Sequence, residues 1–341
     1  MTAPGLTDSF GRQIRYIRLS ITDRCNFRCV YCMPEQGVPS CSHEAILTFE
    51  EILRFCAVAA RMGISRFKIT GGEPLCRKGA ADFMRSLKSL PGVEQVTLTT
   101  NGSLLPGQVD ALAAMGLDAI NVSLDSLDQQ RMRALTRNPA SVATILEGIR
   151  NAQNYGIPIK INTVPMQGYN DADILPLTRY CLENGIHIRF IELMPVGFAK
   201  TCKGIDQQYI MDSLQHAFGS FTPVGHPLGN GPAVAYTVPG FASTVGFISA
   251  LSHKFCATCN RIRMTSQGYI KTCLYHNTGL DMRPFLRSYG PDQKQDSENA
   301  GDNAIAAALR QAVWEKPRAH DFSYEDRPAS PDRFAMSSVG G

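Results

Sequence analysis

The sequence lacks several features that would assign it to particular classes of protein. No stretch approaches the roughly 18 consecutive apolar residues that a membrane-spanning helix needs, and the first residues have neither the basic start nor the apolar core of a signal peptide. Neither basic nor acidic residues are in large excess, since the chain has 34 Lys and Arg and 30 Asp and Glu. These absences predict a cytoplasmic protein that binds neither membranes nor nucleic acid, because nucleic-acid binding needs basic residues clustered on one face.

The first half of the chain alternates between two kinds of pattern. Apolar, β-rich runs are separated by amphipathic stretches at 49–62, 80–90, 109–114, 142–155 and 174–184. Such alternation predicts parallel strands joined by right-handed helical crossovers. A complete or partial barrel built this way carries its chemistry at the carboxyl ends of its strands. The six predicted strands are 16–21, 66–70, 93–99, 119–124, 157–164 and 186–194.

The pattern changes after Pro195, which predicts a division into residues 1–195 and a smaller, irregular region of residues 196–341. Glycine, proline and short strands dominate up to about residue 275, with strands expected within 225–231 and 238–247. The polar segment 287–303 is expected to be a loop or linker, and 304–314 a short helix.

Two sets of three cysteines stand out among the eleven in the chain. Thiols stay reduced in the cytoplasm, so clustered cysteines there bind metal more often than they form disulfides. Three thiolates on a four-iron cluster leave one iron without a protein ligand, whereas structural zinc sites want four closed ligands. The first set lies in CNFRCVYC after the first predicted strand, and the second in FCATCNRIRMTSQGYIKTC. The sets are Cys25, Cys29 and Cys32, and Cys256, Cys259 and Cys273.

Alternatives remain open for both sets. The first triplet would also fit a zinc knuckle or unligated thiols, although no fourth cysteine lies nearer than Cys41. The second triplet would fit a zinc site completed by His253 or His276. The other five cysteines, at positions 41, 56, 76, 181 and 202, are expected to be core or surface thiols.

CNFRCVYC resembles the signature of the radical S-adenosylmethionine superfamily, and Gly71-Gly72-Glu73-Pro74 after the second predicted strand resembles a second element of it. Without the cysteine loop upstream, this GGEP segment would be interpreted as a turn. The resemblance implies an α/β fold, a partial (βα)6 TIM-like barrel, with a 4Fe-4S cluster that cleaves S-adenosylmethionine. It places Tyr31 beside the adenine and the GGEP segment along the methionine end.

The combination with the second triplet resembles one family within this superfamily, the GTP 3′,8-cyclases, or molybdenum cofactor biosynthesis protein A family. The supporting segments are NVSLDSLD, KINTVPMQG, RFIELMP, CNRIR and the terminal double glycine. The resemblance implies a carbon–carbon lyase that converts GTP into (8S)-3′,8-cyclo-7,8-dihydro-GTP, the first step of molybdenum cofactor biosynthesis. It implies abstraction of the C3′ hydrogen, attack on C8, and a second 4Fe-4S cluster whose open iron binds guanine.

The same resemblance assigns site residues. S-adenosylmethionine contacts fall on Tyr31, Gly72, Ser123 and Met194. GTP contacts fall on Arg18, Lys68, Thr99, Lys160, Arg261, Ile262 and Arg263. Gly340 and Gly341 belong to a tail that enters the active site and takes part in catalysis.

Independent reasoning bears on some of these residues. A basic side chain inside a core strand is costly unless it is paired, which favours a polyanion as the partner, although ion pairs with carboxylates stay open. Lys68 stands where many relatives carry arginine, so it keeps the charge without the bidentate fork. Arg189, in the sixth predicted strand, is a weaker correspondence. Ordinary disorder at a chain end is the alternative for the double-glycine tail.

The resemblance further implies an electron donor such as flavodoxin or ferredoxin and, downstream, a cyclic pyranopterin monophosphate synthase. The sequence leaves the oligomeric state open, a homodimer included, and identifies no final proton donor. Two rival functions remain: another radical enzyme with an auxiliary cluster, such as a peptide-modifying maturase, and a zinc- or cluster-stabilised binding protein without turnover.

Overall fold

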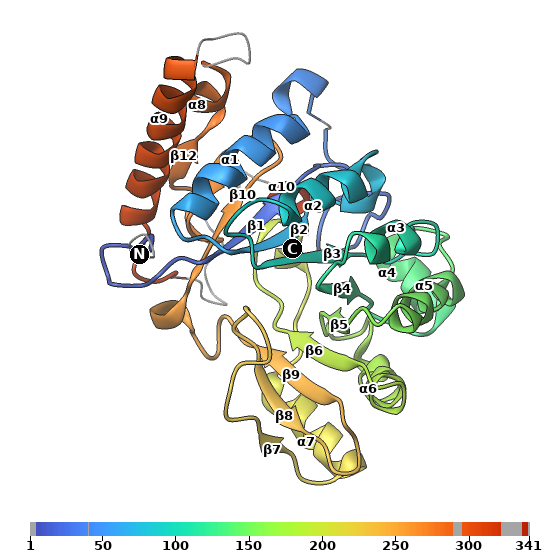
Figure 1. The fold of residues 1–341 in the computed structure, drawn as a ribbon. Helices are drawn as coiled ribbons and strands as arrows, with labels where there is room; N and C mark the ends of the chain where they lie inside the picture. Colours follow the sequence, from blue (N-terminus) through green and yellow to red (C-terminus); the bar gives the residue numbers. More distant parts are fainter. Residues whose placement is uncertain (1–4, 40, 289–294, 322–335, 340–341) are drawn as a thin grey trace.

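A mixed sheet of twelve strands organises the computed structural model, which describes residues 5–39, 41–288, 295–321 and 336–339. Six parallel strands in chain order form its centre, which confirms the predicted α/β alternation. Figure 1 shows them arranged in an arc, an open barrel rather than a flat layer. They are β1 (Tyr16–Ser20), β2 (Arg66–Thr70), β3 (Gln95–Thr100), β4 (Ala119–Ser123), β5 (Ile159–Thr163) and β6 (His187–Ile191).

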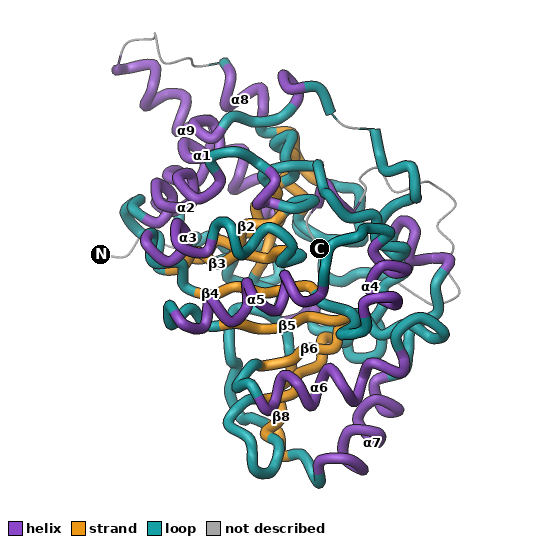
Figure 2. The backbone as a smooth tube through the Cα atoms, turned by 90° about the vertical axis from the view of Figure 1, so that its right-hand side faces the viewer, coloured by secondary structure: helices purple, strands orange, loops and turns teal. Residues whose placement is uncertain are grey.

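Helices cover the outer face of this arc (Figures 1 and 2). Each forms where apolar residues recur at helical spacing, and α1 also carries a capping box in which Thr48 and Glu51 bond each other's backbone N–H groups. The predicted helices are α1 (Phe49–Arg61), α2 (Ala80–Lys88), α3 (Val109–Ala114), α5 (Val142–Asn154) and α6 (Ile174–Glu183). The sequence pattern missed two further helices, α4 (Gln129–Thr136) and α7 (Gln207–Phe218).

Strands from beyond residue 195 extend the same sheet at both edges. β9 (Thr244–Ile248) pairs with β6, and β10 (Arg261–Met264) pairs with β1, both in parallel. The sheet is completed by antiparallel neighbours: β7 (Thr222–Pro223), β8 (Val234–Thr237), β11 (Tyr269–Lys271) and β12 (Gly279–Asp281). The strand expected within 225–231 is wrong, because these residues form the loop between β7 and β8.

The C-terminal part also corrects the prediction of a polar linker at 287–303. Helix α8 (Arg283–Arg287) is followed, beyond residues that are not described, by α9 (Gln295–Trp314), which absorbs the predicted short helix 304–314. The polar first half of α9 is helical because it packs beside α1 (Figure 1). There Asp302 pairs with Arg54 at 3.0 Å and with Arg61 at 2.6 Å.

Strand alternation divides the barrel residues into two sets. The outward set is apolar and buried under the helices, as with Ile17 and Leu19, which are fully buried. The inward set is polar, and the register places Arg18 beside Lys68 on one side and Arg263 on the other. The barrel interior is therefore a site and not part of the apolar core. No helix in the described part of the chain is both long and apolar enough to cross a bilayer.

Candidate active site

The first cysteine triplet lies in the loop after β1 and faces a cavity of about 190 Å³, the first-triplet cavity. Its wall comes from the carboxyl ends of β2, β3, β4 and β6. All four residues predicted to contact S-adenosylmethionine line it together with the three cysteines: Tyr31, Gly72, Ser123 and Met194.

The cysteine loop is held by the end of α4. The backbone N–H groups of Arg28 and Val30 donate to the carbonyls of Thr136 (2.7 Å) and Leu135 (2.9 Å). The Asn138 side chain donates to the carbonyl of Asn26 at 2.7 Å. A helix that the sequence pattern missed therefore holds the backbone of the cysteine loop.

Burial dominates the electrostatics of these thiols. It raises the pKa of Cys25 to about 11 and that of Cys32 to about 12, and it raises the pKa of Cys29 as well. Buried thiolates need positive charge nearby, and thiols give up their protons when metal binds. Three partly buried cysteines that line one cavity therefore fit an iron–sulfur cluster with one open position.

The GGEP segment packs directly against the cysteine loop. A Cβ on Gly72 would lie 2.3 Å from the Arg24 carbonyl oxygen, so only glycine fits. The buried Glu73 carboxylate accepts hydrogen bonds from the Thr100 hydroxyl (2.7 Å) and the Asn101 and Leu75 N–H groups (2.7 and 3.0 Å). Burial raises its pKa to about 7. The GGEP segment thus connects the carboxyl ends of β1, β2 and β3.

Asp125 is a site residue that sequence reasoning missed, although it lies inside the quoted segment NVSLDSLD. It is buried in the first-triplet cavity and accepts a hydrogen bond from the Tyr31 hydroxyl at 2.8 Å. The Val164 N–H also donates to it at 2.8 Å. Burial raises its pKa despite these bonds. Asp125 therefore ties Tyr31 to the barrel wall.

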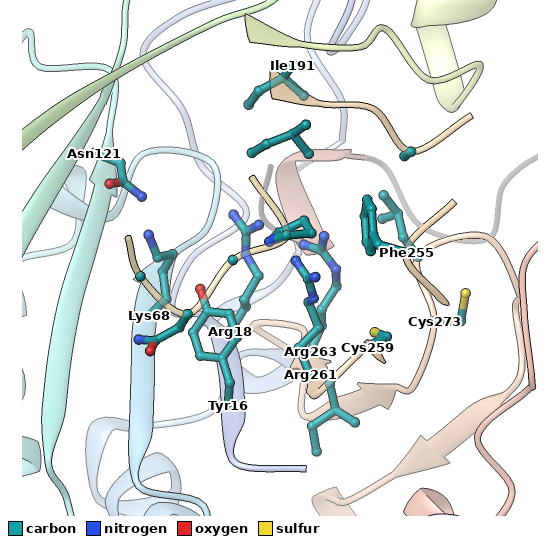
Figure 3. Close-up of a pocket in the computed structure, with 18 of the residues that line it drawn as sticks. Tyr16, Arg18, Lys68, Asn121, Ile191, Phe255, Cys259, Arg261, Arg263 and Cys273 are labelled. Atoms are coloured by element: carbon teal, nitrogen blue, oxygen red, sulfur yellow. The ribbon is translucent and has the colours of Figure 1, made fainter. Parts of the chain in front are cut away.

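The second cysteine triplet faces a larger cavity of about 250 Å³, the cationic cavity. Its three thiols lie beside β10 and β11, and Figure 3 shows Cys259 and Cys273 opposite Lys68 and Asn121. No Asp or Glu among the described residues lines it. Its lining includes eight basic side chains: Arg18, Lys68, Lys160, Arg189, Arg261, Arg263, Lys271 and Lys316.

Crowded positive charge shifts the ionisation of these residues. Burial lowers the pKa of Lys68 well below its usual range, and Arg18 and Arg189 lower it further. Burial and Arg189 lower the pKa of Lys160 to about 8. Basic groups that share a cavity whose described lining holds no Asp or Glu form a site for a polyanion.

The second triplet differs electrostatically from the first. Burial by itself raises the pKa of Cys259, but the nearby Lys316 and Arg261 lower it below its ordinary value. Sequence reasoning missed two lysines near this triplet: Lys271, which lies inside the quoted cysteine segment, and Lys316, which lies outside every quoted motif. Neither histidine of the zinc alternative, His253 or His276, lines the cavity. In the described chain, no three His, Cys, Asp or Glu side chains form a group that could hold a single metal ion.

Four predicted substrate or catalytic positions lie outside the set that lines the cationic cavity with its side chains. Thr99 lines the first-triplet cavity and not the cationic one. Ile262 borders the cationic cavity but is fully buried in the apolar core, so its main chain is what can face a ligand. Gly340 and Gly341 lie outside the described residues. The other predicted GTP contacts all line the cationic cavity: Arg18, Lys68, Lys160, Arg261 and Arg263.

The two cavities adjoin. Asn162, Ile191, Met194 and Met336 line both. Met336 begins α10 (Met336–Val339), a short helix near the end of the chain that contacts β1. The two triplets therefore face a connected interior, and the chain's last described helix lies where the cavities meet.

Comparison with known proteins agrees with this geometry. Residues 19–181 match the model of the Radical SAM superfamily, and residues 186–322 match the model described as Molybdenum Cofactor Synthesis C. The GTP 3′,8-cyclase of Heliobacterium modesticaldum is 42% identical, covering 98% of this chain and 100% of that protein. The protein of the same name from Pelotomaculum thermopropionicum is 39% identical with the same coverage.

Solved structures share the fold at low identity. Streptococcus suis SuiB bound to S-adenosylmethionine superposes with a TM-score of 0.59 at 17% identity, covering 87% of this chain and 68% of that one. The anSMEcpe protein with bound AdoMet gives 0.54 at 12% identity, covering 91% and 93%. These likenesses establish the fold alone.

Proposed function

The chain belongs to the family of GTP 3′,8-cyclases, and from this premise we propose how its residues carry out the family's reaction. The reaction is the radical cyclisation of GTP, the first step of molybdenum cofactor biosynthesis, and it uses S-adenosylmethionine and an iron–sulfur cluster. The observation that carries the assignment is the pair of thiol triplets facing one connected interior.

In this proposal residues 1–195 form the radical-generating core. Cys25, Cys29 and Cys32 hold a 4Fe-4S cluster, and Tyr31, Gly72, Ser123 and Met194 surround S-adenosylmethionine. The shared cavity that these residues line supports the assignment. When bound, the cluster and S-adenosylmethionine supply the electron and the adenosyl radical that start the reaction.

Residues 196–341 supply the substrate side. We assign a second 4Fe-4S cluster to Cys256, Cys259 and Cys273, with an open iron for the guanine. The donor set supports a cluster, because three thiols face one cavity beside Arg261 and Lys316, whose charges favour the thiolate of Cys259.

The basic residues of the cationic cavity bind the triphosphate. A triphosphate carries about four negative charges and suits several convergent Lys and Arg side chains. Arg18, Lys68, Lys160, Arg261 and Arg263 are assigned this role, together with Arg189, and the main chain of Ile262 borders the same space. Thr99 is better placed to contact the ribose side, because it lies in the adjoining first-triplet cavity.

The barrel orients the sugar between the two sites. With guanine at the second triplet and the phosphates on the cations, the ribose lies where the cavities meet, near Asn162 and Met194. C3′ then faces the first-triplet cavity. In this proposal the barrel wall holds the sugar in position for the radical step.

The end of the chain contributes to the same space. Gly340 and Gly341 are assigned a catalytic role, supported by Met336, which lines both cavities four residues upstream. Two residues without side chains can enter a narrow passage that a larger residue would block.

Two partners complete the proposal. An electron donor such as flavodoxin or ferredoxin reduces the cluster, and a cyclic pyranopterin monophosphate synthase takes the product.

The test is anaerobic incubation of cluster-loaded protein with S-adenosylmethionine, a reductant and GTP. We expect the parent protein to hold about eight irons per chain and to form 5′-deoxyadenosine and the cyclised nucleotide. Cys259→Ser should form no cyclised product, although its first triplet still binds iron. Cys29→Ser should form neither product. A chain with both clusters loaded that forms no 5′-deoxyadenosine would refute the assignment.

A further inference from the structure

A glycine-rich loop closes one part of the cationic cavity. Residues 228–231 (Leu-Gly-Asn-Gly), which form the floor loop, connect β7 to β8 and line the cavity. These residues form a loop where the sequence pattern predicted a strand. Among the residues that the structure describes, no acceptor takes the backbone N–H groups of Gly229, Asn230 or Gly231. All three residues line the cavity, so an anion bound there lies next to backbone N–H groups without a protein acceptor.

The floor loop is anchored to the amino ends of three strands. Arg66, the first residue of β2, donates to the Asn230 side-chain oxygen at 2.7 Å, and the Asn230 amide donates to Gln95, the first residue of β3. Lys160 of β5 donates to the Leu228 carbonyl at 2.6 Å. The loop therefore lies at the end of the barrel opposite the first triplet, which sits at the carboxyl ends.

Two cations flank the loop at one residue. A Cβ added to Gly229 would lie 3.5 Å from Lys160 Nζ and 3.9 Å from Arg189 Nη2. Both cations and the floor loop also line a small recess off the cationic cavity, and no cysteine lines that recess. The recess therefore opens away from the second triplet.

We propose that the floor loop, with Lys160 and Arg189, binds the terminal phosphate of the nucleotide and selects a triphosphate over a diphosphate. This inference rests on the proposed function, which places guanine at the second triplet. The terminal phosphate is the group farthest from the purine, and the recess is the part of the cavity that the thiols do not reach. Backbone N–H groups recognise phosphate without adding side-chain bulk.

Gly229→Ala is a direct probe of this arrangement. The backbone of Gly229 does not have a positive φ, and its added methyl would meet only ordinary contact distances, so the variant should fold. The methyl would occupy the space beside Lys160 and Arg189 that the phosphate requires. Gly225→Ala is the matched control, because Gly225 belongs to the same connection, has open space around it, and lines neither the cavity nor the recess.

The experiment measures dissociation constants of GTP and GDP for the anaerobic holoenzyme and both variants, with iron content as the check on integrity. We expect Gly229→Ala to weaken GTP about tenfold or more, the loss of roughly one charge-assisted phosphate contact, and to leave GDP within about twofold. Asn230→Ala, which frees the loop from Arg66 and Gln95, should also weaken GTP binding more than GDP binding. Gly225→Ala should match the parent protein.

Other outcomes overturn the inference. Equal weakening of GTP and GDP binding by Gly229→Ala would mean that the loop does not distinguish the terminal phosphate. Unchanged binding of both nucleotides would mean that the loop does not contact them. The same loss in Gly225→Ala would also contradict a local contact. Parent holoenzyme that binds neither nucleotide would instead refute the proposed function itself.

Discussion

At the scale of single residues, the hydrogen bond between Tyr31 and Asp125 links the cysteine loop to the barrel. Tyr31→Phe removes the hydroxyl and keeps the ring. We expect S-adenosylmethionine to bind about tenfold more weakly, since a hydrogen bond to a buried charged group contributes roughly 1.5–3 kcal/mol. Equilibrium binding to the reconstituted protein measures the change. Unchanged binding would mean that the ring is positioned by packing alone.

Gly72 is a second residue at which a small substitution should have a large effect. Gly72→Ala would place a Cβ 2.3 Å from the Arg24 carbonyl oxygen, so the cysteine loop must move. We expect destabilisation of roughly 1–3 kcal/mol, the usual cost of overpacking, together with loss of iron from the first triplet. Thermal unfolding and iron analysis are the measurements. Gly107→Ala, which approaches nothing closer than 4.0 Å, should leave both unchanged.

At the scale of elements, Arg12 joins three segments that are far apart in the chain. Its buried guanidinium pairs with Asp8 at 2.5 Å and donates to the carbonyls of Cys256 (2.9 Å), Pro317 (2.7 Å) and Arg318 (2.8 Å). It therefore fixes both the second cysteine loop and the segment after α9 that carries Lys316.

Replacing Arg12 should release these segments. Lys cannot reach three carbonyls and a carboxylate with one nitrogen, so Arg12→Lys should lose iron from the second triplet and expose the chain near Pro317 to protease, with the first cluster intact. Spectroscopy of the two clusters and limited proteolysis provide the readouts. Arg310→Lys, at an exposed position of α9, is the control. Equal loss of both clusters would argue for general unfolding instead.

At the scale of the whole molecule, the cationic cavity couples substrate binding to pH. The pKa of Lys160 is about 8 in the free protein, because burial and Arg189 disfavour its charge. A bound polyanion favours the charged form and raises this pKa, so GTP binding takes up a proton near pH 8. We expect GTP affinity to fall between pH 7 and 8.5. Lys160→Arg, which stays charged, should flatten the profile. An affinity that rises with pH would contradict this.

The lowered pKa of Lys160 also makes the free energy of unfolding depend on pH. Between about pH 8 and the ordinary lysine value of 10.5, the unfolded chain holds a proton on Lys160 that the folded, nucleotide-free protein has lost. The free energy of unfolding therefore rises with pH over this interval. Denaturant titrations of the nucleotide-free protein at pH 8 and 9.5 measure it. Lys160→Met, which has no proton to lose, should show a smaller rise.

The features of the chain that indicate its family are local ones. The spacing of each cysteine triplet, the glycine pair before Glu73 and the six alternating strands are local properties of the chain, and local patterns are what periodicity and motif spacing record. The predicted S-adenosylmethionine residues accordingly came together in one cavity.

How the two halves of the chain meet depends on tertiary contacts. β10 lies beside β1, so Arg263 aligns with Arg18 and the second triplet faces the same interior as the first. No local pattern encodes that pairing, nor the helical start of α9, whose Asp302 needs α1, nor the floor loop under the barrel. Each depends on contacts between distant segments, and those contacts exist only after the chain has packed.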